Sequence, residues 1–257
     1  MPKAVVPSVL KGAHLLDVVA ASRNPFSLAE LSQTLGLPKS SVLSLCTSLT
    51  QAGLLTRFED GTYHLGTHLV DLAHAYLSRT DLTQEFGRAW DSLRTLPGES
   101  AVLAVLDGAD VVYVACRNGS QPFALTYRIG MRLPAHCTAS GKALLSTMSD
   151  ERVRQLYHGR KLERLTRHSR NSVKALLSDL EAVRGQGYAV DDEETREGMC
   201  CYGAPVFDAT GRQAVAAVAL SMMKSAGSTR MADLAVKTIH ELAELMSHRL
   251  GMIPGTN

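Results

Sequence analysis

The sequence contains no long hydrophobic run, and none approaches the roughly 18 to 20 apolar residues that a membrane-spanning helix requires. The first residues, MPKAVVPSVLKGAHLL, lack the cleavage pattern of a signal peptide. No low-complexity tract indicates disorder. These absences exclude a membrane-embedded protein, and they predict a folded, cytoplasmic one that has no membrane partner.

Cysteines are few and irregularly placed. There are five, at Cys46, Cys116, Cys137, Cys200 and Cys201. An odd number that includes a vicinal pair does not resemble the framework of a disulfide-stapled secreted domain, so we expect reduced thiols. No C-x-x-C pair occurs, which argues against a zinc ribbon. We expect neither a metal nor a cofactor.

Excess positive charge is also absent. The net charge is only +2, and within residues 1–70 five basic residues face four acidic ones. If the chain binds DNA, a few positioned cations and backbone amides must supply the phosphate contacts, and dimerisation would double their number. The length of 257 residues, with 45% hydrophobic and 20% charged residues, favours a small domain followed by a medium one, each with its own core.

Two short helices are expected after a first helix over residues 8–21. Ser27 and Glu30 have the Ser-x-x-Glu spacing of a capping box, in which each side chain bonds the other residue's backbone amide. Leucines follow at helical spacing, and Gly36 is placed to end this helix. Pro38 then stands near the first turn of the next helix, as the residue type prefers.

The helix after Pro38 has a small, polar outer face. Val42, Leu45, Cys46 and Leu49 recur at i, i+3, i+4 and i+7, which predicts that they are buried. Short hydroxyl side chains on the other face would let the helix backbone approach a DNA duplex while bonding phosphates or base edges. The predicted DNA contacts on this helix are Lys39, Ser40, Ser41, Ser44, Thr47 and Ser48.

Short strand-like segments flank Asp60-Gly61, which predicts a hairpin with a two-residue turn. The order helix, helix, turn, helix, hairpin is that of a winged helix-turn-helix, whose third helix enters the major groove while helix ends and the hairpin touch phosphates. Ser27 at a helix start and Arg57 in the hairpin are therefore also predicted DNA contacts. A packed helical corner with a merely solvated face would share this local pattern, so the segment alone leaves both interpretations open.

The predicted fold class is α+β, with a winged helix-turn-helix over residues 1–65, a linker helix over 66–80 and an effector domain over 81–257. The apolar side chains along one face of this linker helix could pair with the same face in a second copy of the chain. Beyond residue 100, strands are expected at 100–106, 111–117, 123–129 and within 201–223, with helices at 138–146, 150–157, 172–186 and 228–248. An antiparallel sheet flanked by helices can enclose a small-molecule cavity.

Several separate stretches together resemble the IclR family of bacterial transcriptional regulators. They are GLPKSSVLSLCTSLTQAGLL, GMRLPAHCTASGKALL, GYAVDDEETREGMCCYGAPVFDATG and the closing helix. The resemblance spans nearly the whole chain. It implies an operator-binding winged helix-turn-helix, a GAF-like effector domain, and a homodimer or dimer of dimers as the working form.

The resemblance also implies a ligand pocket. Its matching positions here are Ala139, Ser140, Asp191, Cys201, Ala219 and Ser221. Thr138 can cap a helix that begins at Ala139, which would aim free amides at an anion. Apolar side chains such as Leu125 and Met131 are expected around the other end of the ligand. A small organic acid, aromatic acids included, is the predicted effector.

Other classes of function remain open from the sequence. Cys200 or Cys201 could serve as a nucleophile with His136 as base, or these residues could bind zinc with Cys137. A buried cysteine more often acts as a small hydrophobe, and His136 more often bonds the backbone, so we expect no enzyme. A metabolite-binding protein without DNA binding is a further alternative. The charge runs DDEETRE and RKLERLTRHSR are expected to be solvated faces.

Overall fold

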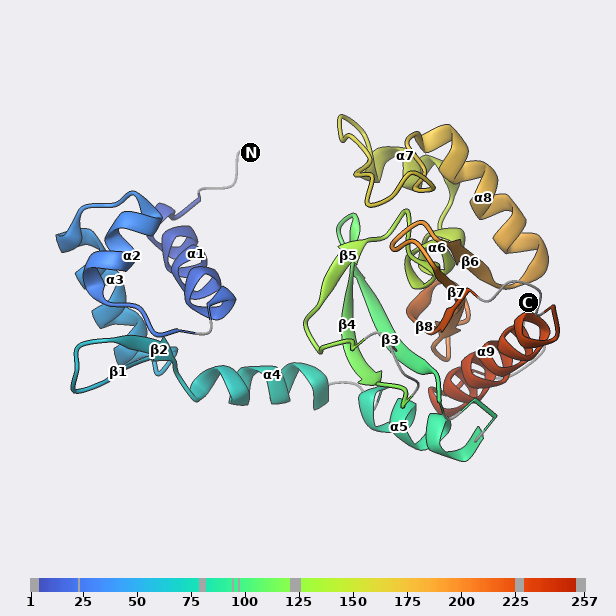
Figure 1. The fold of residues 1–257 in the computed structure, drawn as a ribbon, viewed down its shortest axis with the longest axis horizontal. Helices are drawn as coiled ribbons and strands as arrows, with labels where there is room; N and C mark the ends of the chain where they lie inside the picture. Colours follow the sequence, from blue (N-terminus) through green and yellow to red (C-terminus); the bar gives the residue numbers. More distant parts are fainter. Residues whose placement is uncertain are drawn as a thin grey trace. The chain divides into compact units, whose positions relative to one another are not determined.

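The computed structural model describes residues 5–22, 24–78, 82–93, 95–96, 98–120, 126–224 and 229–252. The chain divides into two compact units, residues 1–79 and 80–257 (Figure 1). Each unit has its own cluster of buried hydrophobic side chains. The expectation of a small domain followed by a medium one therefore agrees with the architecture.

The first unit contains a helix-turn-helix followed by a hairpin. Its elements are α1 (Pro7–Ala21), α2 (Leu28–Leu35), α3 (Lys39–Gln51), β1 (Leu55–Arg57), β2 (Tyr63–Leu65) and α4 (His68–Ser78). The Ser27 side chain accepts from the amide of Glu30, whose carboxylate accepts from the amide of Ser27, so the capping box is confirmed. Gly36 ends α2 with a left-handed backbone (φ 62°), as only glycine adopts freely.

The predicted apolar stripes form the core of this unit. Leu31 on α2 and both Val42 and Cys46 on α3 are fully buried, and they pack with Leu15 of α1. Phe26 also joins the hairpin, since its amide donates to the carbonyl of Tyr63 and its carbonyl accepts from the amide of Tyr63. This bridge ties the start of the helix-turn-helix to the hairpin.

The two-residue turn expected at Asp60-Gly61 is wrong. The last strand pair is Arg57 with Tyr63, and the amide of Phe58 donates to the carbonyl of Thr62. The loop therefore holds three residues, and Gly61 carries the positive φ of 82° that such loops need. Asp60 accepts from the amide and the hydroxyl of Thr62, which stabilises this longer turn.

The second unit is built on one antiparallel sheet of six strands. Their spatial order is β5-β4-β3-β8-β7-β6. The strands are β3 (Ser100–Asp107), β4 (Asp110–Arg117), β5 (Arg132–Pro134), β6 (Ala189–Asp192), β7 (Met199–Phe207) and β8 (Ala214–Met223). The helices are α5 (Leu82–Leu93), α6 (Ala139–Ser146), α7 (Asp150–Leu156), α8 (Val173–Gln186) and α9 (Thr229–Arg249).

Helices cover both faces of this sheet. Helix α6 packs on β7 and β8 with α8 beside it, and α5 and α9 pack against each other and against the sheet (Figure 1). Because side chains alternate along a strand, Cys201 faces the α6 side while Cys200 faces the side where α9 begins. The two neighbouring thiols therefore lie on opposite faces of the sheet.

The strand expected at residues 123–129 is not found where the structure describes it. Residues 121–125 lie outside the described residues, and 126–128 are not in a strand. The Asn118 side chain explains this, because its amide oxygen accepts from the Tyr127 amide and its nitrogen donates to the Tyr127 carbonyl. A side chain thus takes the place of a neighbouring strand. The short strand β6 was not among the predicted elements.

The other expected helices are present, with ends that differ by a residue or two. Arg79 and Thr80, at the end of the predicted linker helix, lie outside the described residues, and α4 covers most of the rest. Within the part of the chain that the structure describes, no helix combines the length and apolarity needed to cross a membrane.

Candidate functional site

A cavity of about 190 Å³ lies in the second unit, between the sheet and the start of α6. Fourteen residues from five strands, the capped start of α6 and two loops line it, several of them aromatic or apolar. They are Tyr113, Thr126, Tyr127, Met131, Leu133, Thr138, Ala139, Ser140, Asp191, Thr195, Arg196, Cys201, Ala219 and Ser221. Residues far apart in sequence thus meet at one enclosed space.

Seven of the eight predicted effector contacts line this cavity. They are Met131, Ala139, Ser140, Asp191, Cys201, Ala219 and Ser221. The eighth, Leu125, lies outside the described residues. Strand pairing brings three of the seven together, because Cys201 of β7 pairs with Asp191 of β6 on one side and Ser221 of β8 on the other.

The start of α6 provides unsatisfied donors at the cavity. Thr138 caps the helix by accepting from the amide of Gly141 at 3.0 Å. The amides of Ala139 and Ser140 make no backbone hydrogen bond within the described residues. Ser140 is only 1% exposed, and its hydroxyl lies near the Tyr113 hydroxyl but makes no hydrogen bond of good geometry among the described residues. Buried polar groups are normally paired, so this end of the cavity is prepared for a ligand atom.

A glycine lets the helix come this close to the sheet. A Cβ on Gly203 of β7 would lie 2.6 Å from the carbonyl of Ala139 and 2.9 Å from the Ser140 nitrogen. Gly203 therefore lies directly beneath the α6 amides, two residues along β7 from Cys201.

Two tyrosines form a wall that sequence reasoning missed. The Tyr127 hydroxyl donates to Ser221 Oγ at 2.7 Å, and the rings of Tyr113 and Tyr127 meet edge to face with centroids 5.3 Å apart. Burial raises the pKa of both phenols, so they stay protonated at neutral pH and can donate hydrogen bonds. Tyr127 was missed because residues 123–129 were expected to form a strand. In the structure Tyr127 belongs to a loop that lines the cavity.

Asp191 is buried but well bonded. One carboxylate oxygen accepts from the amides of Glu194 and Thr195, and the other accepts from the Thr195 hydroxyl. Burial nevertheless raises its pKa, because the charged form loses more hydration than these bonds restore. The carboxylate is thus turned toward its own loop, which reduces its repulsion of an anion in the cavity.

The expectation that DDEETRE is a solvated face is wrong for two of its acids. Asp191 and Glu194 are 2% and 3% exposed. Glu194 bonds Lys142 of α6, which is also buried and lies 3.7 Å from Asp179. This pair fastens the loop after β6 to α6, next to the cavity. In RKLERLTRHSR, Leu162 and Ser169 are also buried.

The alternative of a cysteine enzyme has little geometric support. His136 Nε2 bonds the carbonyl of Glu163 at 2.8 Å, and burial lowers its pKa. Burial raises the pKa of Cys137 to about 12 and that of Cys201 well above its usual range. Such thiols are poor nucleophiles. Among the described residues, no cluster of three or more His, Cys, Asp or Glu could hold a metal ion.

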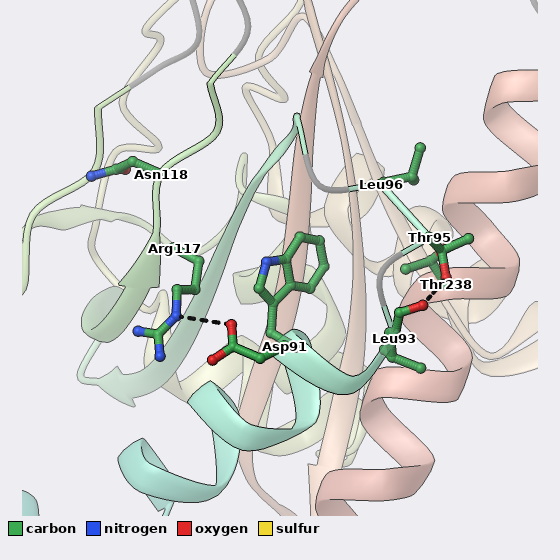
Figure 2. A pocket seen from close by; sticks show the side chains of 8 residues that line it. Asp91, Leu93, Thr95, Leu96, Arg117, Asn118 and Thr238 are labelled. Carbon is green, nitrogen blue, oxygen red and sulfur yellow. Dashed lines mark hydrogen bonds and ion pairs between the residues drawn. The ribbon is translucent and has the colours of Figure 1, made fainter.

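A second cavity, of about 310 Å³, lies between α5, the end of β4 and α9. Figure 2 shows Arg117 and Asp91 at its side, with Nε and Oδ1 3.6 Å apart. Trp90 and Thr238 also line it. None of the predicted contacts is among the described residues around it, and its one ion pair is between exposed side chains, which stabilises little.

The predicted DNA-facing residues of α3 share one exposed surface. Lys39, Ser40, Ser41, Ser44, Thr47 and Ser48 are all exposed. The hydroxyls of Ser44, Thr47 and Ser48 each donate to the backbone carbonyl four residues earlier. Arg57 is exposed on β1 with its guanidinium 5.8 Å from the centre of the Tyr63 ring. Ser27 is half-buried, and its hydroxyl donates to the Glu30 carboxylate.

Comparison with known proteins gives matches over both units. Residues 8–58 match the IclR helix-turn-helix domain, and residues 74–248 match the family described as bacterial transcriptional regulator IclR C-terminal. The HTH-type transcriptional regulator XynR of Escherichia coli K12 is 32% identical over 223 residues, which cover 86% of this chain and 88% of XynR.

Solved structures agree with this assignment. The crystal structure of the repressor BlcR of Agobacterium tumefaciens is 36% identical, with a TM-score of 0.63 and coverage of 97% of this chain and 99% of BlcR. An IclR homologue from Microbacterium hydrocarbonoxydans, complexed with 4-hydroxybenzoate, shares the fold at 18% identity, with a TM-score of 0.78 and coverage of 94% and 99%. The chain belongs to the IclR family of DNA-binding bacterial transcriptional regulators, whose C-terminal domain binds effectors.

Proposed function

We propose that this chain regulates transcription by binding operator DNA through α3 and the β1–β2 hairpin, and that a small organic acid in the cavity at α6 modulates the binding. The observation that carries the proposal is the unsatisfied, buried donor set of Ala139 and Ser140, in a chain that also has a winged helix-turn-helix. Such donors at a helix start favour an anion.

On the DNA side, the residues at the start of α3 are the proposed phosphate contacts. Lys39 is exposed, and the hydroxyls of Ser40 and Ser41 have no partner among the described residues, so they can donate to phosphate oxygens. The hydroxyls of Ser44, Thr47 and Ser48 already donate to the helix. Their free lone pairs suit them to accept from base amino groups in the major groove.

The hairpin and the start of α2 have different roles in this proposal. Arg57 lies exposed on β1 beside Tyr63, where it can reach a phosphate next to the groove. Ser27 has its hydroxyl engaged by Glu30, so we assign its side chain to the cap of α2 rather than to DNA. In this proposal the positive N-terminal end of α2 attracts a DNA phosphate, and the Ser27 side chain does not contact it.

We propose that the working form is a homodimer or a dimer of dimers. Exposed apolar side chains in the first unit give it a surface to cover: Val5, Val6, Val9 and Leu10 at α1, and Val70 and Leu72 on α4. Large exposed apolar groups that lie together mark interaction sites. Two linked heads would also compensate for the low net charge, because the second head binds at a high effective concentration.

The size and chemistry of the cavity define the effector class. About 190 Å³ is below the roughly 300 to 1,000 Å³ of pockets for drug-sized ligands, so the ligand is small. The helix start attracts its carboxylate, while tyrosine rings and Met131 can pack on an apolar or aromatic body. The homologue complexed with 4-hydroxybenzoate binds such an aromatic acid in the same fold.

Coupling between effector and DNA would pass through the segment over residues 66–80, between a DNA-binding domain at 1–65 and an effector domain at 81–257. A ligand shifts only an equilibrium whose states it binds unequally, so the effector must favour one arrangement of the paired heads. Because operator DNA lies in the bacterial cytoplasm, we propose that the chain acts there. No catalytic step is part of the proposal, because the cavity thiol is held protonated.

A mobility shift with the DNA upstream of the chain's own gene tests the proposal. We expect specific binding that is changed by at least one member of a panel of small acids. Ser140→Pro, which removes one cavity amide, and Ser221→Leu, which fills the cavity, should abolish the response to the acid while leaving DNA binding intact. A protein that binds acids but no DNA would instead be a metabolite-binding protein, and turnover of an ester or thiol substrate would indicate an enzyme.

A further inference from the structure

The loop that joins β6 to β7, residues 193–198, adds a charged residue to the cavity that neither the sequence motif nor the helix start explains. Arg196 lines the cavity and is exposed. It is the cation among the described lining residues. This inference rests on the proposed function, because it concerns what the same cavity binds.

The five acidic side chains of residues 191–197, the segment that contains Arg196, are already engaged. Asp192 and Glu193 both bond Lys224 at 2.6 Å, and Glu194 bonds Lys142. Two further acids are held as well: Asp191 by the amides of Glu194 and Thr195 and the Thr195 hydroxyl, and Glu197 by Arg167 at 3.4 Å. Within the described residues Arg196 forms no ion pair, so its guanidinium is available to a ligand anion.

The loop is rigidly built, which makes Arg196 part of a formed site. Glu193 has a φ of 62°, and it is the non-glycine residue with a positive φ among those described. Its carboxylate accepts from the Gly198 amide at 2.9 Å, and its own amide donates to the Met199 carbonyl. Strained backbone that is held by several bonds is typical of ligand-binding loops.

The backbone positions of the two anion-attracting features lie near opposite ends of one stretch of β7. Gly203 lies under the amides of α6, Cys201 lines the middle of the cavity, and Met199 donates its amide to the carbonyl of Arg196. These three positions share one face of the strand. Gly203 and Met199 are four residues apart, which is roughly 13 Å at about 3.3 Å per residue, and the long arginine side chain can shorten that span.

We propose that the effector is a small dicarboxylate: one carboxylate binds the amides of Ala139 and Ser140 and the Ser140 hydroxyl, and the other binds the guanidinium of Arg196. A planar guanidinium pairs with a carboxylate through two parallel hydrogen bonds, which gives geometric selection as well as charge. A monocarboxylate of the same length would leave Arg196 unpaired.

Calorimetric titration of the full-length protein with matched acids tests this. The pairs are hexanedioate with hexanoate, and benzene-1,4-dicarboxylate with 4-methylbenzoate, together with butanedioate and pentanedioate to vary the span. At least one diacid should bind about tenfold or more tightly than its matched monoacid, as a charged hydrogen-bonded pair warrants. Arg196→Gln should remove that difference while leaving the affinity for the monoacid unchanged. Lys174→Gln, which removes an exposed charge from α8 outside the cavity lining, should preserve it.

Three outcomes are informative. Selective loss of diacid binding in Arg196→Gln supports the proposal. Equal affinities for diacid and monoacid in the parent protein, or an equal loss of both in Arg196→Gln, overturn the dicarboxylate while an acid effector still stands. If none of the acids binds, and no acid of the mobility-shift panel changes operator binding, the acid effector of the proposed function fails as well.

Discussion

The Tyr127 hydroxyl donates a 2.7 Å hydrogen bond to Ser221 Oγ, which joins a loop to a strand 94 residues further along the chain. Both side chains are buried and line the α6 cavity. The bond holds the loop of Tyr127 to β8 at the cavity. It also fixes the edge-to-face contact of Tyr127 with Tyr113, so a single loop residue orders much of the wall.

Replacing Tyr127 with phenylalanine should therefore lower the free energy of unfolding by about 1 kcal/mol, since the hydrogen bond is lost in a dry environment. Tyr157→Phe is the matched control. The Tyr157 hydroxyl reaches the Ala109 carbonyl only at 3.5 Å, and its loss should change stability by less than about 0.5 kcal/mol. Urea denaturation of the three proteins measures both changes, and equal losses would contradict the assigned role of Tyr127.

The buried pair of Lys142 and Glu194 should respond strongly to single changes. Lys142→Met leaves the Glu194 carboxylate buried without its cation, and we expect a loss of about 3–5 kcal/mol. Lys142→Met combined with Glu194→Leu removes both charges and should recover most of that loss. Chemical denaturation of the single and double variants forms the cycle. If the double variant is as unstable as the sum of the single ones, the pair is not coupled.

Local patterns in the sequence predicted much of the fold. The capping box of Ser27 and Glu30, the left-handed Gly36 and the Thr138 cap are decided within a few residues, so sequence spacing is sufficient evidence for them. The same holds for the buried stripe of α3, which follows from helical periodicity. The cavity residues around α6 were assigned through a resemblance that covers the whole chain.

Features that depend on distant partners were missed. The run DDEETRE looks solvated because its partners Lys142 and Lys224 lie on other elements. Residues 126–128 have the composition of a strand, but the Asn118 side chain bonds the backbone of Tyr127. The three-residue turn near Gly61 depends on the register of the hairpin, which the Asp-Gly pair alone does not determine.

The Glu193 carboxylate should make the free energy of unfolding depend on pH in the acidic range. Its bond to Lys224, and then the Gly198 amide, lower its pKa from the usual 4.5 to about 2. A lowered folded pKa stabilises the native state above the unfolded pKa, and this stabilisation is lost as the pH falls toward 2. The difference in unfolding free energy between the parent and Glu193→Gln should therefore be constant above pH 5 and shrink between about pH 4.5 and 2.

Lys224→Met is the companion variant for this test, because it removes the largest cause of the shift. It should lose the same acid dependence. A difference between the parent and Glu193→Gln that stays constant down to pH 2 would show that the carboxylate titrates at its ordinary pKa. Denaturation curves at intervals of half a pH unit provide the measurement.

Alkylation should divide the cysteines into two groups. Burial raises the pKa of Cys46 to about 11, that of Cys137 to about 12 and that of Cys201 well above its usual value. Thiolate is the reactive species, so these three should react slowly in the native protein at pH 8. The half-buried Cys116 should react first, and Cys200, which is also half-buried but whose pKa is raised by burial, should follow it. Mass spectrometry of peptides after timed labelling reports each site, and rapid labelling of Cys201 would revive the case for a reactive cysteine.

The salt dependence of operator binding tests how α3 docks. Lys39 is exposed at the start of α3, beside hydroxyls that have no partner among the described residues. If it binds a phosphate, Lys39→Ala should weaken binding to specific and unrelated DNA alike. It should also reduce the slope of log affinity against log salt by about one for each phosphate that the lysine neutralises. Lys174→Ala on α8 removes one exposed charge from the other unit and should leave the slope unchanged.

Ser41→Ala removes a hydroxyl but no charge, so it should weaken binding at every salt concentration with little change in slope. Fluorescence anisotropy at five salt concentrations separates these results, and an unaltered slope in Lys39→Ala would require α3 to meet the duplex with a different end.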